Sequence, residues 1–162
     1  MNDQPLLAKS WKPSKDQPNL PTYARLVPHV RAVERAGESI VEVCGELILQ
    51  NLSLPAAFWR SRLQRAVKVA CLCHDLGKAN EGFQKMVRAE LDPRHQPARH
   101  ELLSALMLED QSSPVRGWAL KQLSDADSEG EAEMLLDCVI GAVAGHHLKL
   151  DQEWKKIGRA HV

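Results

Sequence analysis

The chain has 162 residues, of which 44% are hydrophobic and 26% charged, and this balance is typical of one globular domain rather than of a disordered or fibrous chain. Its 21 basic and 21 acidic residues give a formal net charge of zero, which argues against a protein that holds nucleic acid across a broad basic surface. No apolar run approaches the roughly 20 residues that span a bilayer, and the start lacks a signal peptide, so we expect a cytoplasmic protein without membrane contacts.

The first half of the sequence predicts an arm followed by two long helices. Residues 1–27 are rich in proline and have little periodicity, which indicates an extended N-terminal arm before a domain over residues 28–162. Apolar residues at helical spacing predict a helix over about 28–50. A second helix is expected to be capped by Ser53, with Pro55 in its first turn, and to run to Leu76, where Gly77 would end it with a positive φ.

The second half also predicts only helices. A short helix over 81–91 and a loop over 92–97 precede helices over 99–109 and 114–123. Ser128 and Glu131 have the spacing of a capping box for a strongly apolar, buried helix that extends to about His146. A last amphipathic piece is expected over 152–157. Because no stretch alternates as a strand would, the predicted fold class is an all-α bundle.

The four cysteines have no spacing typical of a disulfide framework and lie in apolar helical stretches. They are therefore predicted to be reduced, buried thiols. Cys71 and Cys73 stand two residues apart and would point to different faces of a helix, so a zinc site on these thiols is not expected.

Histidines and one aspartate occur at the ends of predicted helices, where they could meet at one end of a bundle. The candidates are His29, His74, Asp75, His100, His146 and His147. Imidazoles and a carboxylate without thiolates suit a divalent transition metal such as manganese, nickel, cobalt or iron. A single histidine at a helix end is more often a cap or a dipole partner. Spacing alone therefore leaves both interpretations open.

A series of short motifs makes the metal site the stronger hypothesis. The run from His74 to Gln84, HDLGKANEGFQ, has the form HD-x-G-K-x-x-x-x-F-Q. Arg-His-Glu at 99–101 with Ser-Ala at 104–105, Gly-His-His at 145–147 and an upstream His29 follow the same order as in one known family. The sequence thus resembles the HD nuclease domain that accompanies the CRISPR-associated helicase of type I interference systems, a branch of the HD phosphohydrolase superfamily.

The resemblance implies an HD-domain helical bundle with a two-metal centre. One ion would be held by His29, His74 and Asp75, and the other by Asp75 together with His100, His146 and His147, so that Asp75 bridges them. Asp75 and Lys78 would be the catalytic residues, with Lys78 neutralising the scissile phosphate, while Phe83 and Gln84 would pack and orient the site. Glu101 is interpreted as a first-turn acid that favours the helix dipole.

The resemblance further implies a metal-dependent nuclease that cleaves single-stranded DNA. Its partners would be a CRISPR-associated helicase, in the same chain or separate, and a crRNA-guided surveillance complex. The family has one more metal-binding aspartate after the paired histidines, and Asp151 is too close to them to match. We therefore expect a C-terminally incomplete fragment that holds one ion at most and cuts DNA weakly.

Two alternative functions stay open at the level of sequence. An HD phosphohydrolase acting on nucleotides or cyclic nucleotides would share the His/Asp site, but not the G-K-x-x-x-x-F-Q and R-H-E elements. A metal-poor, inactive structural fragment is the other alternative, because of the missing aspartate.

Overall fold

The computed structural model describes residues 4–12, 14–16, 18–92, 98–124 and 129–147. Within these residues the chain forms six α-helices, two short 3-10 helices and no strand, which confirms the predicted all-α bundle. The helices are η1 (Thr22–Ala24), α1 (Leu26–Asn51), α2 (Ala56–Cys73), η2 (Leu76–Ala79), α3 (Glu81–Val87), α4 (His100–Glu109), α5 (Pro114–Leu123) and α6 (Glu129–Gly145).

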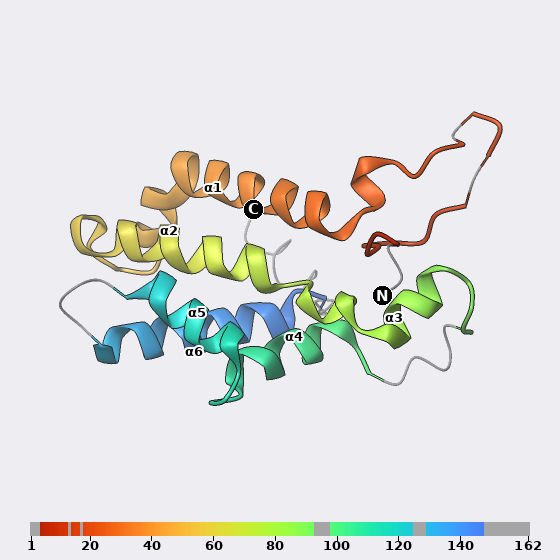
Figure 1. The fold of residues 1–162 in the computed structure, drawn as a ribbon. Coiled ribbons are helices and arrows are strands. Elements are labelled where there is room, and N and C mark those ends of the chain that lie inside the picture. The colour runs from red at the N-terminus through yellow and green to blue at the C-terminus, as the bar shows by residue number, and fades with distance from the viewer. Residues whose placement is uncertain (1–3, 13, 17, 93–97, 125–128, 148–162) are drawn as a thin grey trace, which may run out of the picture.

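The long helices lie in two groups (Figure 1). In the upper group α1 and α2 run antiparallel, and Gly37 lets them approach closely, because a Cβ there would lie 2.6 Å from Sγ of Cys71. Below α2 lie α4, α5 and α6. The core between the groups is aliphatic and includes the fully buried Leu108, Leu136 and Val139. This burial of apolar side chains drives the packing that brings the helix ends together.

Several predicted helix boundaries hold, and those around α2 do not. The helix α5 has the predicted limits, and α4 and α6 begin within two residues of them. Ser53 does not cap α2, since it has a φ of 56° in the preceding turn and Pro55 occupies the N-cap position without a side-chain cap. The helix ends at Cys73 rather than at Leu76. Gly77 has no positive φ and lies instead in η2.

The remaining predictions differ in detail. The helix α3 ends at Val87, earlier than predicted, and Ala89 follows with a φ of 60°. The capping box at Ser128 and the piece over 152–157 lie outside the described residues. All four cysteines are free, but only Cys73 is buried, whereas Cys44 and Cys138 are exposed, so the prediction of buried thiols is wrong for these two. No helix of the described part of the chain is both long and apolar enough to cross a membrane.

Candidate metal centre

Four helix ends meet at one end of the bundle, and they carry all the predicted metal-binding residues. His29 lies near the start of α1, and His100 is the first residue of α4. The His74–Asp75 doublet directly follows the end of α2, and the His146–His147 doublet directly follows the end of α6. Because α1 runs antiparallel to α2, and α4 antiparallel to α6, the starts of two helices lie beside the ends of the other two (Figure 1).

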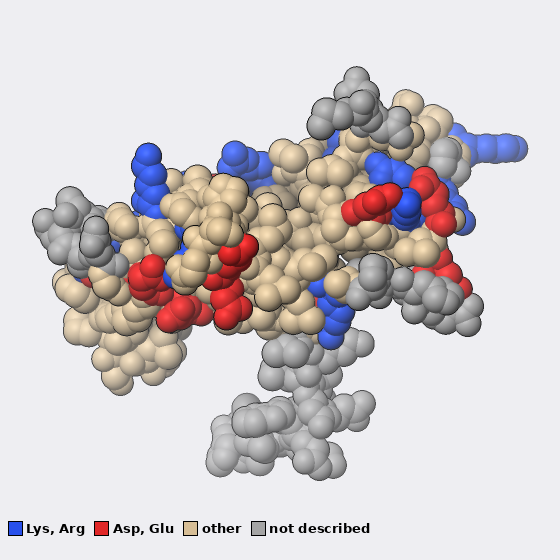
Figure 2. Space-filling model, turned by 60° about the horizontal axis from the view of Figure 1, so that its bottom comes forward, with Lys and Arg blue, Asp and Glu red and all other residues tan. Residues whose placement is uncertain are grey.

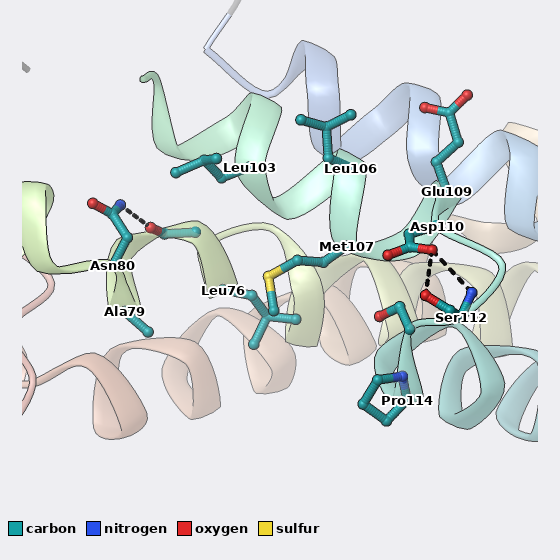
Figure 3. A pocket seen from close by; sticks show the side chains of 12 residues that line it. Leu76, Ala79, Asn80, Leu103, Leu106, Met107, Glu109, Asp110, Ser112 and Pro114 are labelled. Carbon is teal, nitrogen blue, oxygen red and sulfur yellow. Dashed lines mark hydrogen bonds between the residues drawn. The ribbon is translucent and has the colours of Figure 1, made fainter. Parts of the chain in front are cut away.

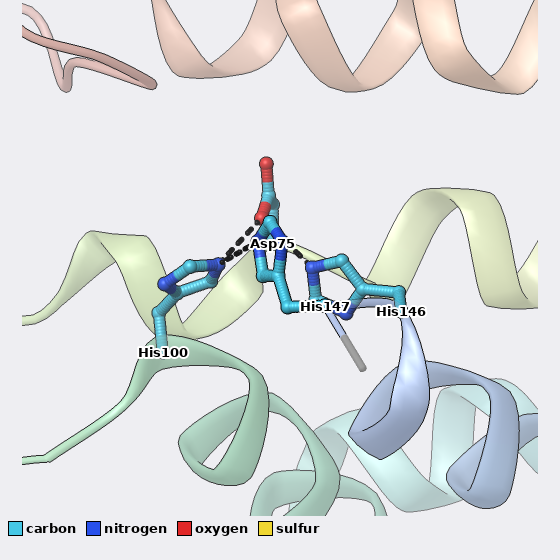
Figure 4. A group of neighbouring side chains, drawn as sticks. All are labelled: Asp75, His100, His146 and His147. Carbon is cyan, nitrogen blue, oxygen red and sulfur yellow. Dashed lines mark hydrogen bonds and ion pairs between the residues drawn. The ribbon is translucent and has the colours of Figure 1, made fainter. Parts of the chain in front are cut away.

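The carboxylate of Asp75 is the centre of this cluster and is almost completely buried. Its Oδ2 lies 3.1 Å from Nε2 of His29 and 3.1 Å from Nε2 of His74. Its Oδ1 lies 3.3 Å from Nε2 of His100 and 3.6 Å from Nε2 of His146. Figure 4 shows Asp75 between the side chains from α4 and those after α6.

Two sets of ligand atoms share this one carboxylate. The first set is His29, His74 and Asp75, and the second is Asp75, His100, His146 and His147. Within each set, one ligand atom of every residue lies within 4.8 Å of the others. The first set gathers at Oδ2 and the second at Oδ1, so each oxygen of Asp75 faces one set. A carboxylate placed in this way can bridge two cations.

The hydrogen bonds of two histidines fix which ring nitrogen faces Asp75. Nδ1 of His74 lies 2.8 Å from the carbonyl oxygen of Cys71, and Nδ1 of His146 lies 2.6 Å from that of Val143. A carbonyl oxygen only accepts hydrogen bonds, so in each neutral ring Nδ1 carries the proton and Nε2 presents its lone pair to the centre. This is the orientation usual for histidines that ligate metals.

Unpaired buried atoms show that these residues fit a cation. Among the described residues, Nε2 of His146 has no hydrogen-bond partner, and the two oxygens of Asp75 face the ammonium of Lys78 and several imidazole nitrogens but no backbone N–H. When His74 is neutral, the lone pair of its Nε2 faces a carboxylate oxygen of Asp75 at 3.1 Å, and a proton or a metal cation between these two atoms makes the contact favourable. Each unpaired buried polar atom costs about 1–3 kcal/mol. Binding of a divalent cation would remove this cost at Nε2 of His146.

The pKa directions also favour metal-binding protonation states. Burial alone would raise the pKa of Asp75, but His100, His74 and Lys78 outweigh it and hold this pKa well below its ordinary value. Burial lowers the pKa of His29, and Lys78 adds to the effect against the opposing Asp75. Burial also lowers the pKa of His147, together with the neighbouring His146 and His100. The carboxylate is thus ionised, and His29 and His147 favour the neutral, ligating form.

Lys78 lies on the same carboxylate. Its Nζ is 2.7 Å from Oδ2 of Asp75 and 5.6 Å from the centre of the Phe83 ring, and its side chain is mostly buried. The backbone N–H of Lys78 also donates to the carbonyl oxygen of Asp75, across the start of η2. The ammonium group of Lys78 therefore lies beside the carboxylate that the two ligand sets share.

The segment η2 is fastened to the start of α4 by Gly77 and Ser104. The N–H of Gly77 donates to Oγ of Ser104 at 2.8 Å, and this hydroxyl donates to the carbonyl oxygen of His100 at 2.9 Å. A Cβ on Gly77 would lie 2.0 Å from that same carbonyl oxygen. The glycine of the first motif and the serine of the second thus form one packed unit, which sequence analysis did not predict.

Glu101 is a second residue of the site whose role the sequence did not predict. Its side chain is buried rather than solvated, and Oε2 lies 3.5 Å from Nδ1 of His100. The guanidinium of Arg99 pairs with the other oxygen. Burial alone would raise the pKa of Glu101, but its own backbone N–H, His100 and Arg99 outweigh burial and lower it. The only available signal was its place in the R-H-E motif.

An apolar hollow of about 830 Å³ lies beside η2 and α4, but it contains none of the residues of the metal centre. Figure 3 shows its walls, with Leu76 from η2, Leu103 and Met107 from α4, and Pro114 from α5. Oδ1 of Asp110 accepts hydrogen bonds from the backbone N–H and the hydroxyl of Ser112. That polar group is thus engaged within its own turn, which leaves the His/Asp cluster as the candidate reactive site.

The charged side chains form no continuous basic surface on the face in Figure 2. Among the residues described there, Lys and Arg lie in small groups that are separated by acidic groups and by uncharged surface. This agrees with the net charge of zero. Bound metal ions or a partner can supply the concentrated positive charge that such a surface lacks.

Comparisons with known proteins agree with the geometry. Residues 8–161 match the family model described as Cas3, HD domain. Over 148 residues the chain is 34% identical to a CRISPR-associated nuclease/helicase Cas3 of Myxococcus xanthus (strain DK1622). This match covers 91% of the chain but only 18% of the length of that relative. No solved structure matches significantly.

Proposed function

The chain belongs to the Cas3 HD domain family, and on that basis we propose that it is a metal-dependent nuclease domain that cleaves single-stranded DNA in CRISPR type I interference. One observation carries the proposal: two sets of ligand atoms share Asp75, with one carboxylate oxygen toward each set. Two cations held through one shared carboxylate would suit the hydrolysis of a phosphodiester.

His29 and His74 would hold one divalent cation with Asp75, and three further histidines would hold the other, namely His100, His146 and His147. Divalent cations supply Lewis acidity, which lowers the pKa of water and stabilises negative charge on phosphate oxygens. Manganese, nickel, cobalt and iron suit this donor set. Lys78 would add a positive charge at the edge of the centre, within reach of a phosphodiester that approaches Asp75.

The charge distribution supports a substrate that is delivered by a partner. The chain has no net charge, so it lacks the electrostatic attraction by which independent DNA-binding proteins hold a duplex. We propose that a CRISPR-associated helicase, in the same polypeptide or separate, feeds single-stranded DNA to the site. A crRNA-guided surveillance complex would recruit the pair in the cytoplasm.

The test is metal analysis beside a nuclease assay on single-stranded DNA, with the unsubstituted chain, Asp75→Ala and Asp137→Ala. Asp75→Ala is expected to lose metal binding and all cleavage, since both ligand sets depend on this residue. Asp137 is exposed on α6 outside the cluster, so Asp137→Ala should retain both.

Each alternative function has its own outcome in this experiment. Cleavage that survives in Asp75→Ala would refute the two-metal site. Hydrolysis of nucleotides or cyclic nucleotides without cleavage of DNA would instead indicate a phosphohydrolase. A chain that binds neither manganese nor nickel and cuts nothing would be a structural domain.

A further inference from the structure

The side chain of Gln84 uses its entire hydrogen-bonding capacity on the segment before α1, on η2 and on Arg88. Its Oε1 accepts from the backbone N–H of Leu7 at 2.9 Å and from Nη1 of Arg88 at 2.8 Å. Its Nε2 donates to the carbonyl oxygen of Leu7 at 2.9 Å and to that of Lys78 at 2.7 Å. An amide has two acceptor sites and two donor hydrogens, so this buried group is fully satisfied in one orientation.

Residues 6–8 continue this connection to the start of α1. The N–H of Leu26 donates to the carbonyl oxygen of Leu6 at 2.8 Å, and the N–H of Ala8 donates to that of Ala24 at 2.8 Å. Between them, Leu7 packs with Phe83 in a small core of its own. Residues 6–8, which we call the N-terminal tie, thus link η2 and α3 on one side to the start of α1 on the other.

The tie also replaces a missing helix cap. The N-cap residue of α1, Arg25, makes no hydrogen bond from its side chain to the first turn. The first N–H groups of a helix lack partners within the helix and need others. Leu6 supplies one to Leu26, only three residues before His29. Without this hydrogen bond, the first turn of α1, which carries His29, would be held less firmly at its N-terminal end.

We propose that Gln84 is a positioning residue which, through the N-terminal tie, sets His29 against Asp75; this rests on the function proposed above. Gln84 holds the carbonyl of Lys78 and the backbone of Leu7 with one amide group, and so fixes η2 and the start of α1 relative to each other. The three histidines of the second ligand set lie at the start of α4 and directly after α6, and the main core holds these two helices instead. The action of Gln84 is therefore specific to the cation at His29 and His74.

The test compares Gln84→Glu with Gln64→Glu, a matched change at an exposed position of α2. In Gln84→Glu a carboxylate oxygen would face the carbonyls of Leu7 and Lys78 in place of two donors. Calorimetric titration with Mn²⁺ should show affinity at the first ligand set reduced by about 10-fold or more, the usual effect of losing an outer partner of a ligand. The second set should stay within about twofold, and Gln64→Glu should change neither.

A double-mutant cycle with His29→Ala separates positioning from a general structural role. If Gln84 acts through His29, then Gln84→Glu should have no further effect on Mn²⁺ affinity once His29 is absent. An equal loss in both backgrounds, or an equal loss at both ligand sets, would overturn the proposal. If Gln84→Glu does not fold, Arg88→Met removes the bonds to Oε1 of Gln84 and to the Pro5 carbonyl, and should weaken the first set by roughly threefold.

A measurement on the metal-free chain distinguishes this proposal from the proposed function. Gln84→Glu should make hydrogen exchange at the Leu26 amide about 10-fold faster, because the acceptor on Leu6 is no longer held. Unchanged exchange would refute the tie. A different result is that the unsubstituted chain binds no Mn²⁺ while exchange at Leu26 is faster in Gln84→Glu, as expected. That result would refute the nuclease proposal and the effect of Gln84 on metal binding, and the N-terminal tie would then have only a structural role.

Discussion

Replacing Gly77 by alanine should be among the most damaging single-methyl changes in this chain. A Cβ at Gly77 would lie 2.0 Å from the carbonyl oxygen of His100, 2.9 Å from its carbonyl carbon and 2.9 Å from Cβ of Leu103. None of these atoms is the end of a flexible side chain, so the backbone of η2 or of α4 would have to move. The φ of Gly77 is not positive, and the cost therefore comes from packing rather than from the backbone conformation.

The size of the effect follows from two contributions. Overpacking a well-packed core costs typically about 1–3 kcal/mol. Displacing η2 would also stretch the bond from the N–H of Gly77 to Ser104, whose loss costs about 1 kcal/mol. The free energy of unfolding should thus fall by about 3 kcal/mol. Gly117→Ala in α5 is the matched control, because its Cβ would meet nothing within 4 Å and alanine favours a helix by up to about 1 kcal/mol.

Urea unfolding of the metal-free chains measures both changes. Titration with Mn²⁺ should show in addition that Gly77→Ala weakens the second ligand set, since η2 and the start of α4, which carries His100, have to move apart. A Gly77→Ala chain as stable as the unsubstituted one would refute the close packing of η2 on α4. Destabilisation by Gly117→Ala of the same size would show that the effect belongs to glycine replacement in general.

Three further predictions use other parts of the structure. The pKa values of His29 and His147 lie below the ordinary 6.5, so as the pH falls the unfolded chain binds these protons before the folded chain does. Urea unfolding of the metal-free chain should therefore show that the free energy of unfolding falls as the pH drops below about 6.5. The double variant His29→Gln, His147→Gln should show a weaker dependence on pH. Glu101→Gln, which removes the charge facing His100, should weaken Mn²⁺ binding at the second ligand set by about 10-fold in calorimetry and leave the first set unchanged. Burial raises the pKa of Cys73 to about 12, so its thiol should not react with maleimide at neutral pH. Mass spectrometry should find Cys44 and Cys138 labelled in the folded chain and Cys73 labelled only after unfolding, and labelling of Cys73 in the folded chain would contradict the packing of α2.

Local sequence patterns predicted much of the fold because helices are governed by local periodicity. Pro114 and the apolar spacing after it defined α5 fully. The errors around α2 have tertiary causes. Gly77 was predicted to need a positive φ, as glycine after a helix often does. Its small size is used instead against the carbonyl of His100, 23 residues further along the chain, and no local pattern reveals such a contact.

The candidate site shows the same division. The gathering of the six predicted ligands at one end of the bundle followed from their places at helix ends, although their binding of metal stays a prediction. The sequence predicted only general roles for Glu101 and Gln84. Their specific roles depend on contacts with His100 and Leu7, and such contacts cannot be predicted from the spacing of residues. Gln84 in particular contacts Leu7 across 77 positions of sequence. Residues that orient others are thus the part of a site that a single sequence predicts least.

Both doublets stand just after a helix, and the geometry of helix ends gives a reason. Successive side chains leave an α-helix about 100° apart, so two neighbours within one could not easily serve the same centre. After the end of α2 the backbone leaves the helical region, with φ −112° and ψ 11° at Asp75. The last carbonyls of a helix also lack partners within it. In both doublets the first histidine takes the carbonyl three residues before it, Cys71 for His74 and Val143 for His146, so the helix end itself turns Nε2 toward the carboxylate.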